Sequence, residues 1–150
     1  MLFYCGLRRG ELIALDWDDI NLGKEWLMVR FSKNKGARTI PLHPKVRVLL
    51  DKYLKERLPL HSRALITGEK KKRITVTSFN NLVNMWLAIS GLKKKGYSTH
   101  SFRHAFATRL VQKNVNIFMV QKLMGHLSLD STKAYVHFGD KNYQEAINYL

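Results

Sequence analysis

The 150-residue sequence has one cysteine, three prolines and only 11 acidic residues. The single thiol, Cys5, excludes a disulfide framework and a zinc site built from several cysteines. No stretch approaches the roughly 18–20 consecutive apolar residues that cross a bilayer, and the chain does not open with the pattern of a secretory signal. We therefore expect neither a membrane-spanning protein nor a disulfide-stabilised secreted one.

Acidic residues are outnumbered by 26 lysines and arginines, which gives a formal net charge of +15. A mixed, soluble surface on a small domain carries a net charge of only about 2–8. The excess predicts a polyanionic partner, and nucleic acid comes before a membrane surface because no basic amphipathic helix stands out. Hydrophobic residues make up 45% of the chain, so one domain with a real core is expected.

The middle of the first half predicts a small antiparallel sheet. Residues 26–31 are rich in strand formers, and residues 38–40 match them after a basic, turn-like segment. This pattern is typical of a β-hairpin, and residues 16–20 are a candidate third strand. Helical spacing of apolar residues dominates elsewhere, so the fold class is α+β, mostly α-helical with a small three-stranded antiparallel sheet.

Apolar residues at helical spacing predict the remaining elements. In the helix that we expect to begin with an N-cap at Thr77, the inward residues should be Phe79, Leu82, Val83, Trp86 and Ile89. The residues from 61 to 75 are expected to form a basic linker. The expected helical segments are 1–15 with a break at Gly6, 46–54, 77–91, 100–110, 117–124, 131–138 and 142–150.

The segment His100-Ser101-Phe102-Arg103-His104 places an imidazole and a guanidinium three residues apart. On a helix their side-chain roots lie about 5–6 Å from each other, where they can hold a phosphodiester and move a proton near it. An ordinary helical turn with solvated polar residues explains the same pattern. His100 and His104 also have the spacing of zinc ligands, but without a neighbouring carboxylate or cysteine pair no metal is expected.

Two adjacent arginines, Arg8 and Arg9, lie among apolar residues in the segment from Gly6 to Leu12. A guanidinium near a core is costly unless it is paired. Glu11 either forms an ordinary ion pair with Arg8 or holds one arginine while the other binds a phosphate.

Three further features are weak when taken singly. Lys33 and Lys35 at the hairpin tip are either solvated or deliver a proton near DNA. His126 follows Gly125, a residue type that caps helix C-termini, and alone it is typical of a structural histidine. Tyr135 alone is typical of core filling.

The order of these motifs is far more specific than any one of them. Between Gly6 and about Phe138, the chain has the motif order of the tyrosine recombinase (phage integrase) family and therefore resembles that family, including Xer-type recombinases and conjugative-transposon integrases. The matching boxes are Gly-Leu-Arg-x-x-Glu-Leu, a hairpin lysine before a proline, His-x-x-Arg-His, Gly-His and a later tyrosine. The catalytic residues that the resemblance implies are Arg8, Lys33 (with Lys35 as the alternative), His100, Arg103, His126 and the nucleophile Tyr135.

The resemblance implies site-specific recombination of double-stranded DNA, either integration and excision or resolution. The chemistry would be strand cleavage and rejoining through a 3′-phosphotyrosyl intermediate, with no cofactor and no metal. It also implies a single catalytic domain over 1–150, a C-terminal fragment without the N-terminal core-binding domain, and therefore weak DNA binding and poor recombination. A tetramer on paired DNA sites is expected for the full-length protein. Residues 139–150 are expected to form a helix that is either exchanged between protomers or packed in cis. The expected location is the prokaryotic cytoplasm, at the nucleoid.

Other basic residues are predicted to track the DNA backbone. The alternatives are relaxation of DNA by a type IB topoisomerase-like enzyme, a non-catalytic basic nucleic-acid-binding module, and a metal-independent ribonuclease in which Tyr135 would be dispensable. The predicted DNA contacts are Arg9, Lys35, Arg38, Lys70, Lys71, Lys72, Arg73, Lys93, Lys94 and Lys95.

Overall fold

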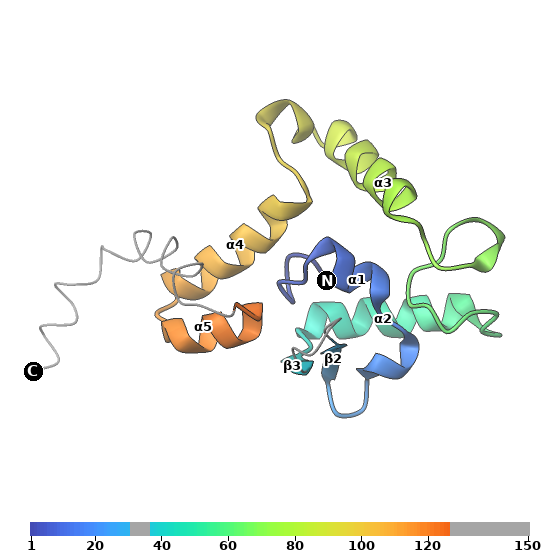
Figure 1. Ribbon diagram of the computed structural model, residues 1–150, viewed down its shortest axis with the longest axis horizontal. Helices are drawn as coiled ribbons and strands as arrows, with labels where there is room; N and C mark the ends of the chain where they lie inside the picture. Colours follow the sequence, from blue (N-terminus) through green and yellow to red (C-terminus); the bar gives the residue numbers. More distant parts are fainter. Residues whose placement is uncertain (31–36, 127–150) are drawn as a thin grey trace, which may run out of the picture.

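The computed structural model describes residues 1–30 and 37–126, and Figure 1 shows their arrangement. The described part is mostly helical with one small sheet, as the sequence predicts. Its helices are α1 (Arg9–Ala14), α2 (Pro44–Arg57), α3 (Val76–Ile89), α4 (Thr99–Gln112) and α5 (Ile117–Met124), with short 3₁₀ turns η1 (Trp17–Asp19), η2 (Glu69–Lys71) and η3 (Lys93–Lys95).

The sheet has the antiparallel order β1-β2-β3. The expected hairpin is confirmed as β2 (Trp26–Arg30) and β3 (Ala37–Pro41), with Leu27 opposite Ile40. Leu27, Val29 and Ile40 are buried, since alternate residues of a strand face the same side. The third strand, β1 (Ile20–Asn21), is shorter than expected because the residues before it form η1.

The first residues of the chain differ from the predicted helix. Gly6 has a φ of +60°, and Arg8 is extended at φ −69° and ψ 152°, so α1 begins only at Arg9. The ring of Phe106 on α4 lies where a β-carbon at residue 6 would be, which makes glycine necessary for this approach. The helix is therefore confined to six residues, and the turns before it bring the chain against α4.

Helix α3 begins slightly earlier than predicted, and only part of the predicted inward side is buried. Thr75, not Thr77, is the N-cap, and its Oγ1 accepts a hydrogen bond from the amide of Ser78 at 3.1 Å. The buried residues are Phe79 and Leu87, whereas Trp86 is 60% and Ile89 70% exposed. The prediction is confirmed for Phe79 and is wrong for Leu82, Trp86 and Ile89, because the helix has no charged residue that would fix its rotation.

Two apolar clusters make up the core of the described residues. The larger joins α1, the hairpin and α2 with Leu65, Ile74 and Phe79, so part of the predicted linker packs into the domain. The smaller lies between α4 and α5 around Ala107, Val120 and Met124. Figure 1 shows α1 above α2, with α4 and α5 to one side.

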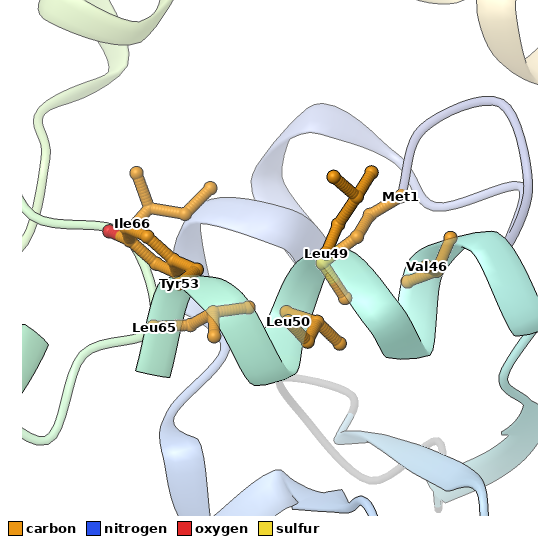
Figure 2. A pocket seen from close by; sticks show the side chains of 7 residues that line it. All are labelled: Met1, Val46, Leu49, Leu50, Tyr53, Leu65 and Ile66. Carbon is orange, nitrogen blue, oxygen red and sulfur yellow. The ribbon is translucent and has the colours of Figure 1, made fainter. Parts of the chain in front are cut away.

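An apolar hollow of about 310 Å³ lies along α2 (Figure 2). Its lining includes Met1, Leu49, Leu50 and Ile66, and Tyr53 is the only lining residue with a titratable side chain. The hollow is therefore mainly an apolar packing surface. None of the described helices is both long and apolar enough to pass through a membrane.

Candidate functional site

Glu11 lies at the centre of a group of arginines where α1 begins. One of its carboxylate oxygens accepts the backbone amide of Arg8 at 2.7 Å, and the other accepts Nη1 of the same arginine at 2.9 Å. The side chain of Glu11 is 11% exposed, whereas that of Arg8 is 42% exposed. The motif Gly-Leu-Arg-x-x-Glu thus makes a helix start in which a largely buried carboxylate holds one partly exposed guanidinium.

Arg38, on β3, also binds the carboxylate of Glu11, although it lies 27 residues later in the chain. Its two terminal nitrogens donate to the two oxygens of Glu11 at 2.9 and 2.8 Å, and its Nε donates to the carbonyl of Leu123 at 2.9 Å. A paired, planar contact of this kind is among the strongest hydrogen-bond arrangements of arginine. Arg38, predicted as a DNA contact, is instead 7% exposed in this network, because Glu11 and Leu123 offer its donors buried acceptors.

Arg103 reaches the group from the second turn of α4. Its side chain is buried and donates to the backbone carbonyls of Gly6 and Met124, the second at 2.5 Å. Its Nη1 lies 3.8 Å from Oε2 of Glu11. The arginine of the His-x-x-Arg box therefore lies between the start of α1 and the end of α5.

His126 follows the end of α5, where Gly125 ends the helix at a φ of +62° as the sequence predicts. The Gly125 carbonyl accepts Nη2 of Arg8 at 3.3 Å, and the His126 amide donates to the carbonyl of Gln121 at 3.2 Å. A β-carbon on Gly125 would lie 2.6 Å from Nη1 of Arg38. The loop that carries His126, with the end of α5 before it, is therefore held by arginines from three other segments.

The charges of this group are unbalanced and shift two pKa values. The hydrogen bonds of Arg38 and Arg8 outweigh burial and lower the pKa of Glu11 to about 2. Burial, followed by the charges of Arg103, Arg8 and Arg38, lowers the pKa of His126 to about 4. At neutral pH one carboxylate thus faces three guanidinium groups and an uncharged imidazole, which leaves an excess of positive charge for an anion.

The other predicted site residues lie elsewhere or outside the described part. His100 is exposed on the first turn of α4, and within residues 1–30 and 37–126 the structure gives it no hydrogen bond or ion pair to the arginine group. Arg9 donates to the side chain of Asn80 at 3.1 Å. Arg73 donates to the carbonyls of Ile13 and Leu15 and so fixes the end of α1. The predicted residues outside the described part are Lys33, Lys35, Tyr135 and the segment 139–150.

The predicted basic loops are exposed. Lys70, Lys71 and Lys72 lie at or next to η2, and Lys93, Lys94 and Lys95 form η3, where Lys93 donates to the side chain of Asn84 at 2.7 Å. No cluster of metal-ligating side chains occurs in the part of the chain that the structure describes.

A model of the phage integrase family matches residues 1–142, which is most of the chain. The chain belongs to the phage integrase family. A tyrosine recombinase of Pseudothermotoga lettingae is 34% identical over 150 residues, covering 100% of this chain and 51% of the relative. The tyrosine recombinase XerC of Caldanaerobacter subterraneus subsp. tengcongensis is 36% identical over 148 residues, covering 96% and 41%.

Solved structures of the same family share the fold. The crystal structure of XerA recombinase superposes with a TM-score of 0.84 at 27% identity, covering 99% of this chain and 54% of that one. XerH recombinase bound to its palindromic difH substrate gives 0.80 at 26% identity, covering 97% and 42%. The chain thus spans about half the length of the relatives it matches, and the resemblance noted from its motifs is confirmed.

Sequence reasoning missed the central position of Glu11 and the burial of Arg38. Glu11 is the only acidic residue among the first 15, and it follows the two adjacent arginines Arg8 and Arg9. That isolation was the available signal. The partner of Arg38 is 27 residues away in the chain, so no local pattern indicates the pair.

Proposed function

We propose that this chain is the catalytic part of a site-specific DNA recombinase, which cuts and rejoins double-stranded DNA without a cofactor or metal. The observation that carries the proposal is the group of Arg8, Arg103 and His126 around Glu11, assembled from three separate motifs. Its excess positive charge suits the phosphorus centre of a phosphodiester, where negative charge grows in the transition state. The names of its relatives, and the DNA complexes among its structural neighbours, support the same substrate.

The proposed first step is a transesterification by Tyr135. Its phenol oxygen attacks the scissile phosphorus, the bond from phosphorus to the 5′ oxygen breaks, and a 3′-phosphotyrosyl ester forms. His100 accepts the phenol proton, and Lys33 protonates the departing 5′ oxygen. A 5′-hydroxyl from another strand reverses the step, so the energy of the broken bond is kept in the ester.

Arg8 and His126 are the groups that we expect to touch the phosphate. The exposed guanidinium of Arg8 can place two N–H donors on one non-bridging oxygen pair. Because the pKa of His126 is about 4, its ring is uncharged at pH 7 and donates a hydrogen bond without titrating. Arg103 supplies its charge from a buried position.

The proposed partner in the full-length protein is a pair of DNA sites held by a tetramer, with residues 139–150 exchanged between protomers. Residues 1–150 would act as the catalytic half of a protein as long as the relatives. The proposed place of action is the prokaryotic cytoplasm, at the nucleoid.

The test is covalent trapping on a nicked suicide duplex followed by a denaturing gel. A labelled protein–DNA adduct is expected with the wild-type chain and in the presence of a chelator. Tyr135→Phe should abolish the adduct, and the matched control Tyr143→Phe, eight residues later, should retain it. An adduct that survives Tyr135→Phe, or that disappears with chelator, would contradict the proposal.

A further inference from the structure

The junction between the two apolar clusters is polar. The α1–hairpin–α2 cluster contains fifteen buried residues, whereas the α4–α5 cluster contains three. Three guanidinium groups donate hydrogen bonds across the junction: Arg103 to the Gly6 carbonyl, Arg38 to the Leu123 carbonyl and Arg8 to the Gly125 carbonyl. Leu123 of α5 also packs against the larger cluster, so the position of α5, and of His126 after it, depends on guanidinium groups together with apolar packing.

Arg38 differs from the other two arginines in what it joins. Its backbone belongs to β3, its terminal nitrogens bind Glu11 at the start of α1, and its Nε binds the last turn of α5. The side chain of Arg38 is 7% exposed, whereas that of Arg8 is 42% exposed. One side chain thus links the strand that follows the hairpin tip to both segments that present Arg8 and His126.

We propose that Arg38 is a positioning residue: by clamping Glu11 and the Leu123 carbonyl together, it aims Arg8 and the His126 loop at one phosphate. This inference rests on the function proposed above. With both oxygens of Glu11 bound by Arg38, a single oxygen also accepts Arg8 Nη1, and Arg8 remains at the surface. Without the clamp, Glu11 would draw Arg8 inward, and the loop after α5 would lose a fixed point.

Arg38→Lys is the direct test because it keeps the charge and removes the planar fork. At saturating suicide duplex, the single-turnover rate of adduct formation should fall on the order of 100-fold, as expected for a misplaced catalytic group. The dissociation constant for DNA should stay within about twofold, because phosphate contacts set affinity and Arg38 is covered. The matched control is Arg47→Lys, whose exposed guanidinium pairs with Glu25, and its rate should not change.

Three results would overturn the inference. The first is a rate of adduct formation that falls only in proportion to the folded fraction measured by circular dichroism. The second is a loss of DNA affinity as large as the loss of rate. The third is a rate of adduct formation that does not change. If Arg38→Lys does not fold, Gly125→Ala tests the same clamp, since its β-carbon would push on Nη1 of Arg38. Its control is Gly91→Ala, where φ is +71° and no atom lies within 4 Å of the added carbon.

A measurement without DNA separates this inference from the proposed function. The ring of His126 should titrate near pH 4 by NMR in the wild-type chain, and its pKa should rise in Arg38→Gln as the loop opens and a cation is removed. An unchanged titration would overturn the clamp even if cleavage occurs. Absence of any adduct from the wild-type chain, with the expected titration shift, would refute the recombinase proposal and leave the clamp standing.

Discussion

The junction around Glu11 and the segment around α3 use positive charge in opposite ways. At the junction, Arg38 and Arg103 are buried, and their hydrogen bonds go to a carboxylate or to backbone carbonyls. Around α3, the lysines of η2 and η3 are exposed, and much of the helix between them is apolar and exposed as well. Figure 1 shows α3 and α4 diverging from the short segment that joins them.

This difference follows from the chemistry of the two cations. A guanidinium offers five donors in a fixed plane and can satisfy several acceptors inside a protein, whereas an ammonium is strongly hydrated and stays at the surface. The same net charge of +15 therefore contains two populations. One population builds the site, and the other is available to attract a polyanion.

The largest effect should come from removing the carboxylate of the junction. Glu11→Gln leaves the buried guanidinium groups without a counter-charge and should lower the free energy of unfolding by about 3–5 kcal/mol, measured by urea denaturation. Asp51→Asn is the control, because it breaks an exposed ion pair with Lys55 and should cost at most about 0.5 kcal/mol. Equal losses in the two variants would remove the distinction between junction and surface.

Acid should weaken the junction through the same carboxylate. The pKa of Glu11 falls from 4.5 to about 2 on folding, so its stabilisation is complete above pH 4.5 and disappears as the pH falls towards 2. The difference between these two pKa values corresponds to about 3 kcal/mol of folding free energy. Urea denaturation at several pH values should show this slope in the wild-type chain and not in Glu11→Gln; a parallel slope in both would contradict the assignment.

His126 should add a second, separate slope. Its pKa falls from 6.5 to about 4 on folding, so the unfolded chain takes up the proton first and stability declines as the pH falls from 6.5 to 4. His126→Gln should remove this part of the pH dependence and leave the more acidic part intact. An unaltered profile between pH 6.5 and 4 would show that the ring titrates normally.

Truncating a buried apolar residue of α3 should reduce stability more than truncating an exposed one. Leu87→Ala should cost at least about 2 kcal/mol, since a 2% exposed leucine leaves a cavity. Ile89→Ala, two residues later and 70% exposed, should change stability by no more than about 0.5 kcal/mol. Thermal denaturation of both variants measures the difference, and a larger loss for Ile89→Ala would restore the orientation that the sequence predicts.

A feature of the fold or of the site can be predicted from the sequence when nearby residues in the chain determine it. The hairpin, the start of α2 at Pro44 and the end of α5 at Gly125 follow from residue types at the positions themselves. The side of α3 that is buried, and the burial of Arg38, depend on contacts with distant segments. Charge alone did not separate Arg38 from the exposed lysines, because only the folded chain brings it to Glu11.

The smallest effect on stability, and the sharpest on binding, should come from the lysines near η2. Replacing Lys70, Lys71 and Lys72 together by glutamine should leave the unfolding free energy within about 0.5 kcal/mol, because the three are exposed. The slope of log K for duplex DNA against log salt should become shallower by about 0.9 for each phosphate that the variant no longer neutralises.

The matched control removes the same charge elsewhere, at the exposed Lys24, Lys45 and Lys52. If the lysines at η2 track the DNA backbone, this control should keep the wild-type salt slope, since its lysines are not among the predicted DNA contacts. Equal slopes in the two triple variants would show that net charge, and not the position of the lysines beside α3, sets the affinity. The exposed cations would then serve only as a diffuse field, and contact with a particular phosphate would rest on Arg8 and the junction behind it.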